Sequence, residues 1–409
     1  MLKAKRLLFA CLLLLAIVPV SCEKEINEEE IYESDNEAIK TRLDLSEVEL
    51  RNIAPSNDFA FSFFKDLYKS DTDILISPLG FQMTLAMLGN GVEDEKTISD
   101  VIGIDGGIKE TNTYFKHLIA SLSSEVFSKE LSLGNALMID SRAAKYPEPF
   151  LDELKSSYSL DYIEIEAKSL LEQPQGKRPE DIWCQDKTGG LLNKAPFPVE
   201  EYQSSLLNFF LFKGEWQDKF DKALTKTSSF YTSPEEFVHT PFMNKQGQIK
   251  FYGCDDYRAV SLPFGDGTFT LSIILPKVSF NVSGVLDKLD SESWDKMRNG
   301  LKKKEVKLSL PVFSTSYSKR FNMDYVFKKG IPPLNLLGQD ALFFMNEDGA
   351  SAAAVTQASI PISPGPSGAQ GIEYFIAESP FIYTISEQGS GLILFIGTYS
   401  GADKEGTES

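Results

Sequence analysis

A short helix that is apolar on nearly every face constrains this chain more than any other feature. Its apolar residues are spread around the helix and do not form one stripe: Leu79, Met83, Leu85, Ala86, Met87 and Leu88. Such a helix is stable only when other elements surround it, so we expect it at the centre of a large core. Ser77-Pro78 suits its first turn, and Gly89-Asn90-Gly91 suits its end. A chain of 409 residues, of which 42% are hydrophobic, is long enough to build that core.

Helical and strand patterns occupy different parts of the chain. Helical spacing covers Phe59–Leu67, where Ser56-Asn57-Asp58 offers N-cap residues, and returns at Thr97–Ile102, Thr111–Leu122 and Pro147–Ser157. Strand-type runs are Ile74–Ile76 and then Leu206–Phe212, Phe269–Leu275, Val306–Leu310, Phe381–Ile385 and Leu392–Thr398. Gln388-Gly-Ser-Gly391 reads as a hairpin turn between the last two runs. Helices first and strands later predict a mixed α+β fold.

The N-terminus carries a targeting pattern. Lys3, Lys5 and Arg6 precede the apolar run 7–18, which is too short to span a bilayer comfortably. The run ends at Ser21-Cys22, which resembles a bacterial lipoprotein cleavage box. We therefore expect a signal peptide over 1–21, then lipidated Cys22 and an acidic tether over 22–52. A folded domain over 53–400 and a polar tail over 401–409 complete the expected organisation. A plain secretory signal is the alternative.

Charge and cysteine usage limit the partners and the chemistry. The formal net charge is −18, and a surface that acidic repels phosphates, so nucleic acid is not an expected partner. If Cys11 leaves with the signal and Cys22 is acylated, Cys184 and Cys254 remain. Their spacing is not that of a metal site, and whether they pair is open.

Enzymatic motifs are weakly represented. Both histidines, His117 and His239, lie in stretches that favour a structural role over that of a catalytic base. The sequence contains no Gly-x-Ser-x-Gly elbow, no His-Glu-x-x-His and no Walker loop. A carboxylate pair of the glycosidase type is not excluded by counting acids. An exported hydrolase that uses one of the two histidines is the least favoured hypothesis.

A run of small residues near the C-terminal end stands between a strand and a loop. The apolar strand pattern Ala341–Met345 leads into Glu347-Asp-Gly-Ala-Ser-Ala-Ala-Ala-Val-Thr356. Residues 357–371, rich in Pro, Gly and Ser, then read as an exposed loop. Between Gly349 and Ser379 there is no Lys or Arg. An ordinary surface loop with an alanine-rich start would give the same pattern.

An ordered set of motifs from about Ile53 to Ser400 resembles the serpin family. The apolar helix and its Ile76-Ser77-Pro78-Leu79 start resemble the buried second helix of serpins, and Asn208-Phe-Phe-Leu-Phe-Lys-Gly-Glu-Trp216 is the most specific match. Further matches are Asn135-Ala136-Leu137, Phe150, Trp183 with Thr188, Gly190 and Leu192, Phe220, Thr225 with Phe230-Tyr231, Leu262-Pro263-Phe264, Ile274-Leu275-Pro276, Ser379-Pro380-Phe381 and Leu394-Phe395-Ile396-Gly397. The small-residue run then coincides with the serpin hinge.

The resemblance implies a serpin fold, with helices packed on three β-sheets and an exposed reactive-centre loop. It implies inhibition by a suicide-substrate mechanism, in which the cleaved loop inserts into a sheet and traps the acyl-enzyme. The expected hinge residues are Glu347, Gly349, Ala350, Ser351, Ala352, Ala353, Ala354, Val355 and Thr356. Ala350 and Ala352 should point inward. Ser77, Trp183 and Asn208 are expected to support the opening of the sheet.

The bait bond and the partners follow from the loop sequence. Counted from Gly349, the spacing between hinge and scissile bond that the serpin resemblance implies ends near Ser363-Pro364. Because Pro364 disfavours cleavage of the bond before it, Ile362–Ser363 is the expected scissile bond. Ser367–Gly368 and Ala369–Gln370 are later options. Without Lys or Arg, the loop favours elastase-like, subtilisin-like or papain-like proteases over trypsin-like ones. We expect a monomer that needs no cofactor or metal and reaches the membrane only through its lipid.

Three departures from the family bear on inhibition. Gly80 stands where serpins usually carry a second Ser beneath the sheet, and Gln339-Asp340 stands where they carry His-Lys. The segment Pro332–Gln339 is also much shorter than its serpin counterpart. These departures concern sheet opening more than the fold, so a non-inhibitory, serpin-like binding lipoprotein is the second interpretation.

Overall fold

The computed structural model describes residues 40–70, 72–167, 177–190, 192–195, 199, 203–321, 326–334, 336–350 and 371–401. All of these belong to one compact unit that begins at Ile39. Among them, no helix has the length and apolar character needed to cross a membrane.

A seven-stranded sheet holds the small-residue run at one end. Its order is β3 (Leu160–Ile165), β2 (Leu131–Asp140), β4 (Ser204–Phe212), β12 (Leu336–Met345), β13 (Gly349–Ala350) and β5 (Gly214–Glu215), with β11 (Phe313–Phe321) paired to β12. β2 pairs antiparallel with β4 along nine positions, whereas β4 and β12 run parallel. β4 is buried along its whole length because both of its faces are covered.

A nine-stranded network contains most of the remaining strands. Its order is β1 (Ile74–Ile76), β16 (Ile393–Tyr399), β15 (Phe381–Glu387), β9 (Phe269–Pro276), β8 (Tyr257–Pro263), β7 (Phe237–Gly253), β10 (Lys302–Pro311) and β14 (Glu373–Ile376), with β6 (Lys226–Tyr231) on β7. The 17-residue β7 pairs with β6 at one end and with β8 at the other. Two of the three expected sheets are therefore hydrogen-bonded into one network through β7, and the predicted α+β fold class is confirmed.

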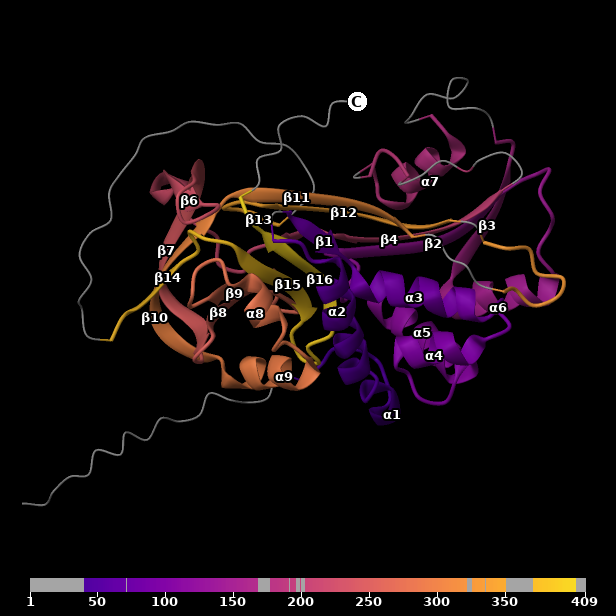
Figure 1. The fold of residues 1–409 in the computed structure, drawn as a ribbon, viewed down its shortest axis with the longest axis horizontal. Helices are drawn as coiled ribbons and strands as arrows, with labels where there is room; N and C mark the ends of the chain where they lie inside the picture. The colour runs from indigo at the N-terminus through magenta and orange to yellow at the C-terminus, as the bar shows by residue number, and fades with distance from the viewer. Residues whose placement is uncertain are drawn as a thin grey trace, which may run out of the picture. The chain divides into compact units, whose positions relative to one another are not determined.

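The helices lie on both sides of the seven-stranded sheet (Figure 1). α7 (Pro179–Lys187) lies on one side, while α3 (Pro78–Gly89), α4 (Glu95–Ile102), α5 (Ile108–Leu122) and α6 (Glu148–Tyr158) lie on the other. α8 (Val282–Leu286) and α9 (Ser291–Gly300) lie against the nine-stranded network, with α1 (Glu47–Leu50) and α2 (Ile53–Leu67) nearby. Every residue of α3 is buried, so the prediction of a central helix is confirmed.

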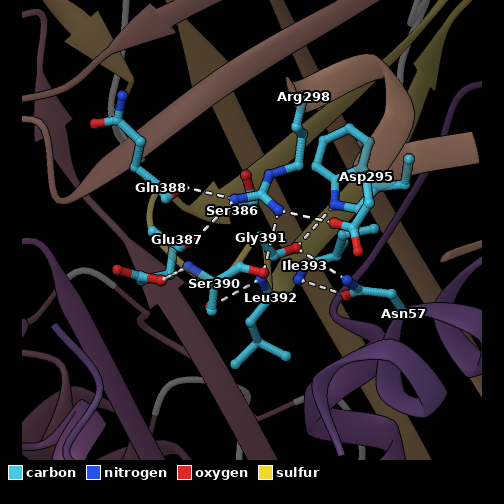
Figure 2. A network of polar contacts seen from close by, with 12 residues as sticks. Asn57, Asp295, Arg298, Ser386, Glu387, Gln388, Ser390, Gly391, Leu392 and Ile393 are labelled. Atoms are coloured by element: carbon cyan, nitrogen blue, oxygen red, sulfur yellow. Dashed lines mark hydrogen bonds and ion pairs between the residues drawn. The ribbon is translucent and has the colours of Figure 1, made fainter. Parts of the chain in front are cut away.

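The start of α2 differs from the expected one. The helix begins at Ile53 with Asn52 as its N-cap, so Ser56-Asn57-Asp58 lie inside it and do not cap it. Buried Asn57 instead donates from Nδ2 to the carbonyl of Gly391 at 3.0 Å and accepts from the backbone N–H of Ile393 at 3.0 Å (Figure 2). The cap prediction was wrong because this partner lies more than 300 residues away along the chain.

Packed chain also begins upstream of the expected boundary at Ile53. Leu43 is buried in the main core, and the backbone N–H of Arg42 donates to Glu387. Cys184 and Cys254 lie in separate apolar clusters, and the possible disulfide between them is not formed.

Candidate functional site

Two residues of the small-residue run, Gly349 and Ala350, form strand β13 and lie inside the seven-stranded sheet. Ala350 of β13 pairs with Met345 of β12 on one side and with Gly214 of β5 on the other, both antiparallel. Ala350 is only 1% exposed and belongs to the main core, so the expectation that it points inward is confirmed. The segment that leads to the loop is thus held between two strands, as a central strand would be.

Close approach of two backbones explains the glycine at position 349. A Cβ atom there would lie 2.1 Å from the carbonyl oxygen of Gly214 and 2.6 Å from the Cα of Glu215. Backbone atoms cannot rotate away as a flexible side chain can, so any other residue must push the two strands apart.

Replacing Gly349 with Ala is therefore expected to destabilise the protein by about 1–3 kcal/mol, the usual cost of an overpacked site. Gly247→Ala on β7 is the matched control, because a Cβ atom there meets nothing within 4 Å. Thermal denaturation followed by circular dichroism measures both. Equal melting temperatures for the two variants would show that β13 is not constrained as described.

The turn before β13 is tied to residues that follow β5. The backbone N–H groups of Trp216 and Phe220 donate to the carbonyls of Asp348 and Glu347, each at 3.0 Å. Trp216 also donates from Nε1 to the carbonyl of Asn346 at 2.7 Å. These bonds attach residues 346–348 to the segment 216–220, which we call the anchoring segment.

Two side-chain contacts extend this attachment. Thr225 donates from its hydroxyl to Glu347 at 2.6 Å, and the ammonium of Lys222 lies 2.6 Å from the carboxylate of Asp348. The hydrogen bond and the charge of Asp348 raise the pKa of Lys222 above its ordinary value. Because both charged groups are largely exposed, the ion pair orients the turn more than it stabilises the fold.

Beyond β13, the described residues of β4 and β12 pair with each other over only part of their lengths. The parallel pairing of these strands covers only Leu336–Gly338 against Ser205–Leu207 among the described residues. An extended segment that continued the register of β13 by six residues would lie opposite residues 344–339 of β12 and, past Lys213, opposite residues 212–208 of β4. The open part of the sheet therefore matches in length the rest of the small-residue run, which lies outside the described residues.

The ladder between β4 and β12 ends next to Asn208, one of the residues expected to support sheet opening. Asn208 donates from Nδ2 to Asn135 at 2.8 Å, and Asn135 donates to the carbonyl of Tyr158 at 2.8 Å. A Cβ atom at Gly80 would lie 2.4 Å from Oδ1 of Asn208 and 3.2 Å from Oγ of Ser77. Gly80 thus lets Ser77 and Asn208 lie close together, and Oδ1 of Asn208 is buried with no hydrogen-bond partner among the described residues.

Trp183, the third residue expected to support sheet opening, lies on the opposite face of the sheet from Ser77 (Figure 1). It is on α7, its ring packs edge-on against Phe209 at 5.5 Å, and its Nε1 donates to Asp161 at 2.8 Å. It does not join Ser77 and Asn208. Because α7 and its cluster cover this face, an inserted strand meets packed neighbours on both sides and must be small on both.

A carboxyl group with a raised pKa lies at the open end of the sheet. Burial, and then the negative charge of Asp266, raise the pKa of Glu130 to about 7, against the lowering effect of Arg42 and Lys129. The backbone carbonyl of Glu130 accepts from the N–H of Lys213, just beyond the end of β4. Glu130 is therefore the titrating group to examine near the hinge.

The folded protein keeps a proton on Glu130 up to about pH 7, whereas the unfolded chain releases it near its ordinary pKa of 4.5. Folding stability should therefore fall as pH rises between these values. We expect Glu130→Gln to melt higher than the wild type at pH 8 and to match it near pH 4. Thermal melts across that range measure the difference, and a difference independent of pH would contradict the assignment.

The described residues just before the shortened segment Pro332–Gln339 pack against the body of the protein. Val92 and Phe327 form an antiparallel bridge, and Glu93 donates to the carbonyl of Val326 at 2.8 Å. Gln339 and Asp340 lie within β12, which pairs with β11 along nine positions. The shortening therefore leaves both strands in place at the edge of the opening.

Several predicted residues fall outside the described part of the chain: Ser351, Ala352, Ala353, Ala354, Val355, Thr356, Ile362, Ser363 and Cys22. The sequence interpretation missed the anchoring segment as a functional element. Trp216, Phe220 and Thr225 contributed there only to a family resemblance, although all three hold the hinge turn.

Both histidines are exposed, with His117 beside Glu49 and His239 against Phe237. Within the described ranges no group of His, Cys, Asp and Glu is placed to hold a metal.

Comparison with known proteins gives a consistent result. A family model described as "Serpin (serine protease inhibitor)" matches residues 54–331 and so ends where the shortened segment begins. Serine protease inhibitor 2 from Anopheles gambiae is 24% identical over 382 residues, which cover 83% of this chain and 90% of that protein. Corticosteroid-binding globulin from Ovis aries is 27% identical over 378 residues, covering 85% and 84%. The native-state crystal structure of tengpin, a thermophilic serpin, shares the fold with a TM-score of 0.72 at 22% identity, over 87% of this chain and 94% of tengpin.

Proposed function

The chain belongs to the serpin family, and from that premise we propose that it inhibits a protease by inserting its cleaved loop into the seven-stranded sheet. Members of this family are generally protease inhibitors, and some are carriers. One observation supports inhibition most directly: β13 is already seated between β12 and β5, and the open stretch beyond it fits residues 351–356.

The residues of that stretch suit insertion. In the continued register, Ala352, Ala354 and Thr356 share the inward face with Ala350, and Ser351, Ala353 and Val355 face α7. None of them carries a charge, and none is Pro, so no inserted residue needs an ionic partner or breaks the ladder. Thr356 would lie opposite Asn208, where its hydroxyl could donate to the unpaired Oδ1. Further insertion must then separate the three-residue ladder between β4 and β12.

The driving force is sufficient for the mechanism. From Gly349 to Ser363 the chain advances 14 residues, roughly 46 Å as a strand at ~3.3 Å per residue. New backbone hydrogen bonds at roughly 1 kcal/mol each supply on the order of 10 kcal/mol. Dragging an acylated protease over that distance can distort its oxyanion hole, and loss of one donor there slows deacylation ~10²–10³-fold.

The proposed bait bond is Ile362–Ser363, and the proposed targets are elastase-like, subtilisin-like or papain-like proteases. The support is the loop composition, since no Lys or Arg lies between Gly349 and Ser379. We also propose that the protein is exported and anchored through a lipid on Cys22. An unmodified Cys22 thiol in the mature protein would contradict the anchor.

Incubation with elastase, subtilisin, papain and trypsin tests the inhibition. We expect an SDS-resistant complex, with the summed mass of inhibitor and protease, for at least one of the first three and none for trypsin. Elastase with a blocked active-site serine is the control, because it cannot form the acyl bond. Cleavage of the loop by every protease of the panel without any complex would reject inhibition.

A non-inhibitory binding lipoprotein is the second candidate. It is favoured by the shortened segment before β12 and by the similarity to corticosteroid-binding globulin, whose name records a carrier. The effect of loop cleavage on heat stability separates the two candidates and is developed in the Discussion.

A further inference from the structure

A hollow of about 340 Å³ lies beside the anchoring segment. Trp216 and Phe220 of that segment, with Leu262 and Pro263 at the end of β8, give it apolar walls. Three lysines line it as well: Lys245, which is paired with Asp218, and two others, Lys250 on β7 and Lys303 on β10. Apolar walls with a few charged groups are typical of sites for small organic ligands.

The two lysines face each other directly across the β7–β10 ladder. Like charges in opposite positions destabilise a sheet, so folding alone gives no reason to place them there. Among the described residues neither lysine forms an ion pair. Burial, and then the positive charges of Lys303 and Arg298, lower the pKa of Lys250. The hollow therefore holds positive charge that no described carboxylate neutralises.

The other charged groups around the hollow already have partners. Asp266 binds Arg42 at 2.6 Å, and Asp218 binds Lys245 at 2.6 Å, with the Lys245 ammonium over the ring of Phe220. Glu305, which follows on β10, accepts from two glutamine side chains of β7. Neither acid that lines the hollow is thus available to pair with Lys250 or Lys303.

Arg298 contributes to the positive charge near Lys250, but its own hydrogen bonds are made to other residues. It pairs with Asp295 at 2.9 Å and donates to the carbonyls of Gln388 at 2.7 Å and of Gly389 and Ser390 at 3.1 Å (Figure 2). The side chain of Gln388 points away from this network and lines the hollow. With its amide turned to satisfy its neighbours, Gln388 accepts from Lys250 at 2.8 Å, so the ammonium has a neutral partner only.

We propose that this hollow binds a small organic anion, with its charged head between Lys250 and Lys303 and its apolar body against Phe220, Leu262 and Pro263. With one Lys250 N–H donated to Gln388, the two ammonium groups still offer up to five donors to a sulfonate, sulfate or carboxylate head, and charge-assisted hydrogen bonds are the strong ones. Hydroxyls of Ser261 and Thr270 lie in the same lining and can donate to the head as well. The site needs neither an open sheet nor a cleaved loop, so it is independent of inhibition.

Calorimetric titration of the native protein with benzenesulfonate tests the proposal. This probe keeps its charge throughout the usable pH range, and neutral benzenesulfonamide is a control of nearly the same shape. We expect saturable binding of one benzenesulfonate and at least tenfold weaker binding of benzenesulfonamide. Equal binding of both probes, or no binding of benzenesulfonate at millimolar concentration, would overturn the proposal.

Three variants locate the site. Lys250→Gln and Lys303→Gln should each weaken benzenesulfonate binding about tenfold, which corresponds to ~1.4 kcal/mol for a lost charged contact. Lys116→Gln removes the same unit charge from exposed α5, outside the lining, and should bind as the wild type does. If Lys250→Gln fails to fold, the exposed Lys303 gives the same information. Wild-type affinity in the lysine variants that fold would reject the assignment.

Discussion

Replacing Ala350 with Arg is expected to convert the protein from an inhibitor into a substrate. Ala350 is 1% exposed and is seated between β12 and β5 in the main core. A guanidinium there has no described carboxylate to pair with, and burying it costs several kcal/mol. The arginine should therefore hold β13 out of the sheet in the uncleaved protein, and insertion would have to bury it again. Since ~1.4 kcal/mol is a factor of ten in rate, insertion should slow by about 10²-fold or more, and deacylation should finish first. The fraction of protein recovered as an SDS-resistant complex should fall to near zero, while the loop is still cleaved.

Two further variants make this result interpretable. Ala350→Ser is the matched control, because it stays small and uncharged, and it should retain most of the complex. Ala354→Arg covers the case in which Ala350→Arg does not fold. Position 354 lies outside the described packing, but in the continued register it must pass between β4 and β12. Unchanged complex formation by both Arg variants would reject insertion as the mechanism.

Cleaving the loop is expected to raise the melting temperature by roughly 20 °C. Insertion adds hydrogen bonds worth on the order of 10 kcal/mol, and in a domain larger than 250 residues each kcal/mol shifts the melting temperature by about 2 °C. The protein should be cut within residues 351–370 by a protease that it does not trap, purified and melted. A carrier that does not insert its loop would melt at the same temperature before and after cleavage, or lower after it.

A shortened chain provides the control for the cut itself. A chain that ends at Gly401 lacks residues 402–409 of the polar tail but keeps the loop intact. Its melting temperature should equal that of the full chain. If both changes raised the melting temperature equally, the gain would not come from insertion.

The sequence predicted those parts of the fold that are set by local pattern. α3 was predictable because residues that are apolar on every face must be buried, whatever surrounds them. The start of α2 was not, because the side chain of Asn57 serves a turn near the C-terminus and not its own helix. A cap and a distant tertiary contact use the same residue types, and a sequence does not distinguish them.

The site was predictable in composition but not in position. Small uncharged residues after a strand indicated a hinge, and Ala350 faces inward as expected. That Gly349 and Ala350 already lie in the sheet depends on the approach of Gly349 to the backbone of Gly214. Such contacts join segments more than 100 residues apart, as do the bonds from Trp216 to residues 346 and 348. A local sequence pattern therefore does not predict these contacts.

The seated β13 has a kinetic consequence. An ordered element nucleates slowly and propagates fast, because its first turn or pair fixes many dihedral angles while few hydrogen bonds form. Here the pairs of Ala350 with Met345 and Gly214 exist before any protease arrives. After cleavage the strand can extend from them at the pace of elementary chain motions and bypass nucleation. In a competition between strand growth and hydrolysis of the acyl bond, this nucleus favours the growing strand.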